Sequence, residues 1–334
     1  MRKCVGLLAV AFCFSVFGQS EVLFLGSEEA VDAVLADSLD PYFSRMHSWE
    51  MVLKTGRQID PSTREMTIEE CREAYRSGVR EFTDDSKAVI SWYVQRADSA
   101  VTNEFPALAS IPWKFILLSD SIEAGFPHTR EGYILLSESL VAALREWREK
   151  QSSGQYVGME ILIHEKMHVL QRMNPAPFER FYQKVWGFRK VNAPALKDLE
   201  NERFIVNPDA STAEWVIKIP AKKTNYILPA IMLKDNSKGM GGNIRRVGIS
   251  VDSTVGGFVP RMDDDGNLDV KDLDAIVQYR RKFPQSEHDY HPHELSADLV
   301  SKYLVMHYLS ARFGTASVSK MDYSRIERLI ESFQ

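Results

Sequence analysis

The sequence predicts an α+β fold, in which helices near both ends of the chain enclose a segment rich in strands. Apolar residues recur at helical spacing from about Ser27 to Asn103, and again after Pro292. Between these regions, short runs of β-branched and aromatic residues alternate with clusters of Gly, Asn and Asp, which is the pattern of strands joined by turns. The 334 residues are enough to bury a core without disulfide or metal supports.

Residues 1–18 have the pattern of a secretory signal peptide. The basic residues Arg2 and Lys3 precede an uncharged apolar run that ends at Phe17, and Gly18 is small. We therefore expect cleavage near residue 18 and export to the periplasm or the exterior. No other stretch approaches the roughly 18 to 20 apolar residues of a transmembrane helix, so no transmembrane segment is expected.

The composition excludes some classes of partner and of stabilisation. The formal net charge is −5, and loss of residues 1–18 changes it to −7, because Arg2 and Lys3 are removed. A mildly acidic chain is not expected to bind nucleic acid. Without the signal segment, Cys71 is the single remaining cysteine, so no internal disulfide can form and Cys71 is expected to be a packing residue. No pattern in the sequence fixes the oligomeric state.

Residues 19–105 are predicted to form a helical lead-in segment. Thr67 and Glu70 have the spacing of a capping box, which predicts a helix start at Thr67. Val89, Ile90 and Tyr93 lie on one face of a further predicted helix. A removable propeptide and a permanent part of the fold are both compatible with this segment.

From residue 106 onward the pattern predicts a second region, 106–334, that mixes strands and helices. The expected elements are strands at 111–118 and 132–136, and helices at 137–150, 156–173 and 177–189. The second of these helices must end before Pro175, because a proline disfavours the helical conformation of the preceding residue. The β-rich runs 214–219, 226–233 and 247–251 predict an inserted sheet over about 205–262. Helix returns at Pro292.

The sequence Ile161-Leu162-Ile163-His164-Glu165-Lys166-Met167-His168-Val169-Leu170 contains the strongest functional motif, H-E-x-x-H. His164 and His168 are one helical turn apart, so both imidazoles project from one face and can bind one Zn²⁺. Glu165 can reach a water at such a metal without being a ligand. The surrounding apolar residues predict a buried helix, in which unpaired Glu and His would be costly.

A catalytic zinc ion usually has three protein ligands, so a third must come from elsewhere. The metzincin continuation is excluded, because Gln171 and Asn174 stand where that pattern needs Gly and His. The best candidate is Glu294, with Asp298 one turn further along, where it can accept a hydrogen bond from a ligand imidazole. Other candidates for the third ligand are His288, His291, His293 and Asp298.

These two motifs resemble the gluzincin metallopeptidases, the thermolysin-like clan. The resemblance covers two short helices and implies a zincin-like catalytic core at 106–334 with the β-rich insertion between the metal-binding helices. It implies that His164, His168 and Glu294 bind zinc, that Glu165 is the catalytic base, and that Asp298 supports a ligand histidine. About 125 residues separate His168 from Glu294, far more than in thermolysin itself.

The function expected from these residues is exported, zinc-dependent hydrolysis of peptide bonds. Zinc lowers the pKa of water to about 7, and Glu165 would accept the proton of the attacking water. Tyr290 or His291 is a candidate donor to the oxyanion. The alternatives are a zinc hydrolase of a non-peptide amide or ester, and a catalytically inactive binding protein with a zincin fold.

Two further features concern substrate and calcium. The strand at 132–136 is a candidate sheet edge where an extended peptide or protein substrate could pair, and residues 128–130 beside it could contact that substrate. The acidic run Asp263–Asp272 has part of the spacing of a calcium loop. Arg261, however, stands where the loop needs its first carboxylate, so a solvated acidic turn is the preferred interpretation.

Overall fold

A computed structural model describes residues 21–38, 41–57, 63–191, 204–211, 214–220, 225–235, 239–284, 286–314 and 323–333. The fold is a mixture of helices and two sheets, as the α+β prediction requires. The signal-like residues 1–18 lie outside the described ranges. Among the described helices, none has the length and apolar character needed to cross a membrane.

The first sheet has five strands in the order β1-β3-β5-β4, with β2 also paired to β3. Strands β1, β3 and β5 are parallel, and β4 is antiparallel to β5. The strand bounds are β1 Val22–Phe24, β2 Val79–Arg80, β3 Trp113–Leu118, β4 His128–Arg130 and β5 Tyr133–Ser137. The strands β3 and β5 confirm the two predicted in this region.

Helices cover both faces of this sheet, which explains why β3 and β5 are almost continuously apolar. Phe115 and Leu136 belong to the main core, together with side chains of α4 (Asp84–Val101), α6 (Glu138–Glu149) and α7 (Gly154–Met173). Ile116 and Leu135 point the other way, into a second cluster formed with α1 (Ser27–Leu35), α2 (Ser48–Thr55) and α3 (Arg64–Gly78). The segment 19–105 therefore supplies two strands and part of both helical layers.

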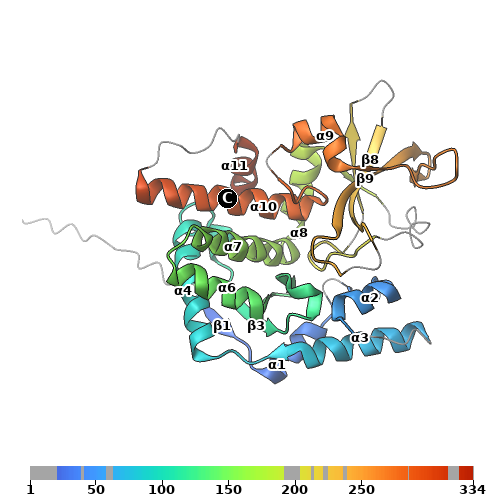
Figure 1. Cartoon of the computed structure of the whole chain (residues 1–334). Coiled ribbons are helices and arrows are strands. Elements are labelled where there is room, and N and C mark those ends of the chain that lie inside the picture. Colours follow the sequence, from blue (N-terminus) through green and yellow to red (C-terminus); the bar gives the residue numbers. More distant parts are fainter. Residues whose placement is uncertain are drawn as a thin grey trace, which may run out of the picture.

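Helices α7 and α10 (Pro292–Phe313) pack against each other along their lengths (Figure 1). Helix α7 is buried nearly all round and ends at Met173, because Pro175 follows. Helix α10 begins with Pro292 at its first position, where a proline costs no hydrogen bond, and ends at Gly314 with φ of 63°. The predicted helices at 156–173 and after Pro292 are confirmed.

The second sheet has six strands, all antiparallel, in the order β10-β9-β8-β7-β6 with β11 also paired to β9. It lies beside one end of α7 and α10 in Figure 1. Its strands are β6 Phe188–Lys190, β7 Trp215–Ile219, β8 Asn225–Leu233, β9 Ile244–Thr254, β10 Gly257–Pro260 and β11 Val270–Asp272. The sheet thus begins before, and ends after, the expected insertion at 205–262.

Shorter helices complete the fold. They are α5 Pro106–Ala109, η1 Ile122–Gly125, α8 Pro175–Phe181, η2 Tyr182–Trp186, η4 Leu273–Ala275, α9 Val277–Lys282 and α11 Ser324–Glu331. The helix predicted at 177–189 ends three residues early, because Gly187 adopts a left-handed conformation with φ of 75° and β6 follows.

Two sequence predictions are wrong in detail. Helix α3 begins after Thr63, whose hydroxyl accepts from the Met66 N–H at 3.2 Å, and Thr67 lies inside the helix. A Thr with Glu three positions later also occurs within helices, so the motif alone does not locate the start. The strand predicted at 132–136 is not a sheet edge, because β5 lies between β3 and β4.

Close packing of α4, α6 and α7 depends on Gly158. A Cβ atom at this position would lie 2.5 Å from Tyr93 Cε1 and 2.6 Å from Leu144 Cδ2. We expect Gly158→Ala to lower the free energy of unfolding by about 1–3 kcal/mol, despite the better helix propensity of Ala. Gly132→Ala is the control, because no atom lies within 4 Å of the added methyl. Equal unfolding midpoints in urea for the two variants would contradict this explanation of the packing.

Candidate metal centre

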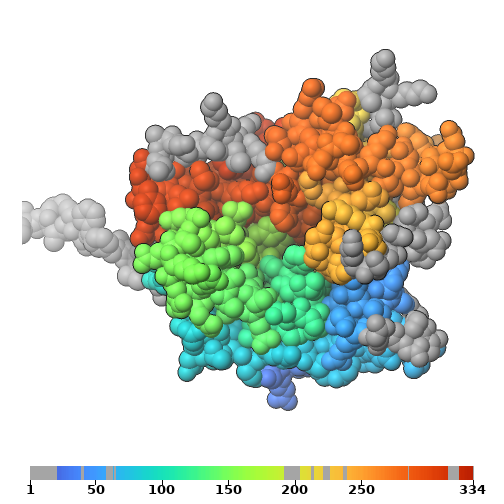
Figure 2. Space-filling model, in the orientation of Figure 1, coloured from blue at the N-terminus to red at the C-terminus, as the bar shows by residue number. Residues whose placement is uncertain are grey.

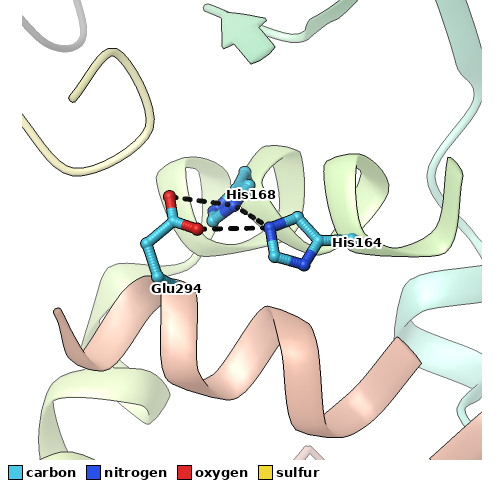
Figure 3. A group of neighbouring side chains, drawn as sticks. All are labelled: His164, His168 and Glu294. Atoms are coloured by element: carbon cyan, nitrogen blue, oxygen red, sulfur yellow. Dashed lines mark hydrogen bonds and ion pairs between the residues drawn. The ribbon is translucent and has the colours of Figure 1, made fainter. Parts of the chain in front are cut away.

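Three side chains from α7 and α10 converge on one point (Figure 3). The two Nε2 atoms of His164 and His168 are 3.0 Å apart. Glu294 Oε2 is 3.3 Å from His164 Nε2, and Glu294 Oε1 is 3.5 Å from His168 Nε2. Donor atoms about 3.3 Å apart are what a tetrahedral ion with bonds of about 2.0–2.1 Å requires. Among the described residues, these three have ligand atoms close enough together to hold one metal ion.

Burial and hydrogen bonding prepare His168 to be a ligand. Its imidazole is buried, which lowers its pKa and favours the neutral form that can bind a metal. Its Nδ1 lies 2.8 Å from Gln171 Oε1, so Nδ1–H donates to this oxygen and Nε2 keeps its lone pair for the centre. The Gln171 amide donates in turn to Ser296 Oγ at 2.9 Å and to the carbonyl of His293 at 3.0 Å, which joins α7 to α10.

The Glu294 carboxylate is buried but negatively charged. Burial alone would raise its pKa, but the neighbouring imidazoles of His168, His164 and His288 hold the pKa well below its usual range. Asn207 Nδ2 donates to Glu294 Oε1 at 2.7 Å. An anionic oxygen pair directed at two imidazoles is the donor set that zinc prefers.

Glu165 lies beside the centre and differs from Glu294 in its surroundings. Its carboxylate is buried, and its Oε2 atom makes no hydrogen bond with any described residue. Burial raises its pKa well above the usual range, and the charges of Asp209 and Glu294 raise it further. A buried oxygen without a partner is costly, and a carboxylate with a raised pKa is suited to accept a proton near neutral pH.

The centre opens into a cavity of about 900 Å³. In Figure 2, the green, yellow-orange and orange-red parts of the chain, near residues 150, 250 and 290, border one another on the visible face of the molecule. Helix α7, the segment 205–209, the β8–β9 hairpin and the chain before α10 all line this cavity. Its lining includes apolar Val157, Ile161 and Ile231, and polar His164, Glu165 and Tyr290.

The remaining predicted site residues have varied positions. Tyr290 lines the cavity, and its hydroxyl accepts from Asn207 Nδ2 at 2.8 Å. His288 Nδ1 lies 3.7 Å from Glu294 Oε2. His291 is the N-cap of α10, where its Nδ1 accepts from the His293 N–H at 3.1 Å. His291 and His293 are thus outside the ligand group, and neither is among the residues that line the cavity.

Asp298 lies one turn after Glu294, as the spacing predicts, but its carboxylate contacts Lys302 Nζ at 2.8 Å. The support of a ligand imidazole that the sequence assigned to Asp298 is provided to His168 by Gln171. The sequence does not identify this residue, because in the motif Gln171 is only a departure from the metzincin pattern. It also does not identify Asn207, which no motif marks.

The candidate substrate edge and the acidic run at 263–272 make contacts within the protein. The edge strand is β4, and its Thr129 N–H already donates to Asp209 Oδ1 at 2.8 Å, while Arg130 pairs with Asp37. In the acidic run, Asp263 Oδ1 accepts the N–H groups of Asp265 at 3.0 Å and Asn267 at 2.8 Å. This is an Asp-stabilised turn, which is the preferred interpretation of that run.

We expect the protein to bind one Zn²⁺ ion per chain. At a free concentration 100 times Kd, zinc should stabilise the fold by about 2.7 kcal/mol, which differential scanning calorimetry can measure as a rise in Tm. His168→Ala and Glu294→Ala should lose this rise. His307→Ala, which removes an imidazole from the same helix α10 outside the centre, should retain it. A zinc-dependent rise that survives in His168→Ala would show that the ion binds elsewhere.

Comparison with known proteins adds no family assignment. No family model, curated protein or solved structure matches the chain. A functional assignment therefore depends on the geometry and the chemistry of the centre.

Proposed function

We propose that this chain is an exported zinc metallopeptidase of the gluzincin type. The observation that carries the proposal is the convergence of His164, His168 and Glu294 at the spacing of zinc ligands, with Glu165 beside them. Histidine nitrogens and one carboxylate oxygen form the donor set of hydrolytic zinc sites, which keep a fourth position for water. The proposal of export is based only on residues 1–18, which have the pattern of a signal peptide.

The residues present fit catalysis as well as binding. Bound zinc would lower the pKa of water and polarise a substrate carbonyl. Glu165, which lies beside the ligands, would accept the proton of the attacking water and then transfer it to the leaving amine. The lack of a protein partner for Glu165 Oε2 among the described residues supports this role, because most buried polar side-chain atoms in folded proteins have a hydrogen-bond partner.

Tyr290 is the remaining candidate for an oxyanion donor. Its side chain lines the cavity and lies within hydrogen-bonding reach of Glu294. The phenol can orient toward a substrate oxygen only when its bond to Glu294 is given up. We propose peptides as substrates because the motifs resemble those of the gluzincin peptidases, and the cavity has the apolar and polar lining that is usual for a binding cleft.

Glu165→Gln separates the binding of metal from hydrolysis. We expect this variant to fold and to bind zinc as the wild type does, and to lose about 10²- to 10⁴-fold in kcat, because general acid–base catalysis contributes about that much. Zinc content and hydrolysis of casein or a fluorogenic peptide library are the measurements. Glu146→Gln on the surface of α6 is the matched control and should keep full activity. An unchanged turnover rate for Glu165→Gln would exclude Glu165 as the base.

The same assay distinguishes the alternative functions. Hydrolysis of an ester or peptidoglycan panel, with casein and peptides intact, would assign the centre to a non-peptide amide or ester. Zinc binding without turnover of any of these substrates would assign the chain to a binding protein with an inactive centre. Both results contradict the peptidase proposal and leave the zinc site in place.

A further inference from the structure

Asn207 connects the metal centre to the loop 205–209, which lines the cavity. Its Nδ2 donates to Glu294 Oε1 at 2.7 Å and to the Tyr290 hydroxyl at 2.8 Å. Its Oδ1 accepts the N–H of Asp209 at 2.8 Å. An amide oxygen that accepts a backbone N–H must turn the amide nitrogen to the opposite side, so the direction of the donor toward Glu294 is fixed by the backbone of its own loop.

The residues on either side of Asn207 are tied to different parts of the fold. Before it, the Val206 N–H donates to Glu50 Oε1 at 2.7 Å, and the Val206 carbonyl accepts from Lys54 Nζ. After it, the carbonyl of Pro208 accepts from Arg172 Nη2 at 2.6 Å. The loop is therefore held by α2 on one side and by the C-terminal turn of α7 on the other.

The contacts from α2 come from a fully buried group of charges. Lys54 Nζ lies 3.0 Å from Glu50 Oε1 and 3.4 Å from Glu123 Oε2, and the hydroxyls of Tyr42 and Tyr75 donate to Glu123. Buried ion pairs contribute little to stability but are costly to break, so they hold their partners in a defined geometry. Here this group of charges holds the backbone of Val206 in place.

We propose that Asn207 is a positioning residue of the metal centre, which α2 holds in place through Val206. A carboxylate on a glutamate side chain can rotate, and a fixed neutral donor selects the orientation in which both oxygens face the two imidazoles without competing in charge with the metal. In this role α2, which lies in the segment 19–105, is part of the working site. The inference rests on the proposed zinc site, and concerns affinity for the ion and not the substrate.

The test is the zinc affinity of Asn207→Ala, measured by competition with a chromophoric chelator. We expect Kd to rise about 10- to 100-fold, as is typical when an outer partner of a ligand is removed. Asn243→Ala is the matched control, because it removes another buried asparagine whose amide bonds to the carbonyl of Asp235. Its zinc Kd should equal that of the wild type. Circular dichroism and the Tm of the zinc-free proteins verify that both variants fold.

A double-mutant cycle tests whether α2 positions Asn207. Glu50→Gln keeps the size of the side chain but weakens its acceptance of the Val206 N–H, so we expect zinc Kd to rise several-fold in the wild-type background. In the Asn207→Ala background the same change should leave Kd unaltered, because the residue through which α2 acts is already absent. Equal effects in both backgrounds would overturn the role of α2.

The outcomes separate this inference from the proposed activity. An unchanged zinc Kd in folded Asn207→Ala overturns the positioning role, and so does faster hydrolysis at unchanged Kd, which would make the loop an obstruction. Wild-type protein that binds no zinc overturns the inference and the proposed function together. A wild type that binds zinc and hydrolyses nothing contradicts the peptidase alone, and the zinc Kd of Asn207→Ala still decides the role of Asn207.

Discussion

The contact between the Glu294 carboxylate and two imidazoles of α7 is the interaction on which the arrangement of the site depends. All three groups lie between two long helices, where His168 and Glu294 are buried from water and His164 lines the cavity. His168 and Glu294 must therefore be oriented by protein neighbours. Gln171 orients His168, Asn207 orients Glu294, and α7 and α10 must stay in register for these bonds to form. The packing of α7 against α10 and the orientation of the side chains in the centre therefore depend on each other.

Helix α7 buries more polar and charged side chains than stability alone would favour. Besides the centre, it buries Lys166, whose Nζ lies 4.0 Å from the centroid of the Trp113 ring and 3.8 Å from Asp98 Oδ1. Burial lowers the pKa of this lysine to about 8. The helix can hold such groups because the apolar faces of α4, α6, α10 and the first sheet surround it. The apolar core therefore offsets the cost of the polar centre.

The sequence predicted the parts of the site that follow from local periodicity. His164 and His168 share a helix face because of their spacing, and Glu294 follows a proline that marks a helix start. Gln171 and Asn207 could not be predicted, because their roles depend on contacts between segments far apart in the chain. His291 could not be separated from the ligand candidates either, since its capping of α10 is a property of backbone geometry. Similarly, the position of β5 inside its sheet depends on pairing with β4, which no periodicity encodes.

The long interval between the two ligand-bearing helices affects how the site can assemble. About 125 residues, including the whole second sheet, lie between His168 and Glu294. Closing so long a loop is entropically unfavourable, so we expect contacts across it to form late in folding. An ion that needs both helices cannot guide the early steps of chain collapse. The proposed ion would bind a polypeptide whose topology is already complete, and would therefore slow unfolding far more than it accelerates folding.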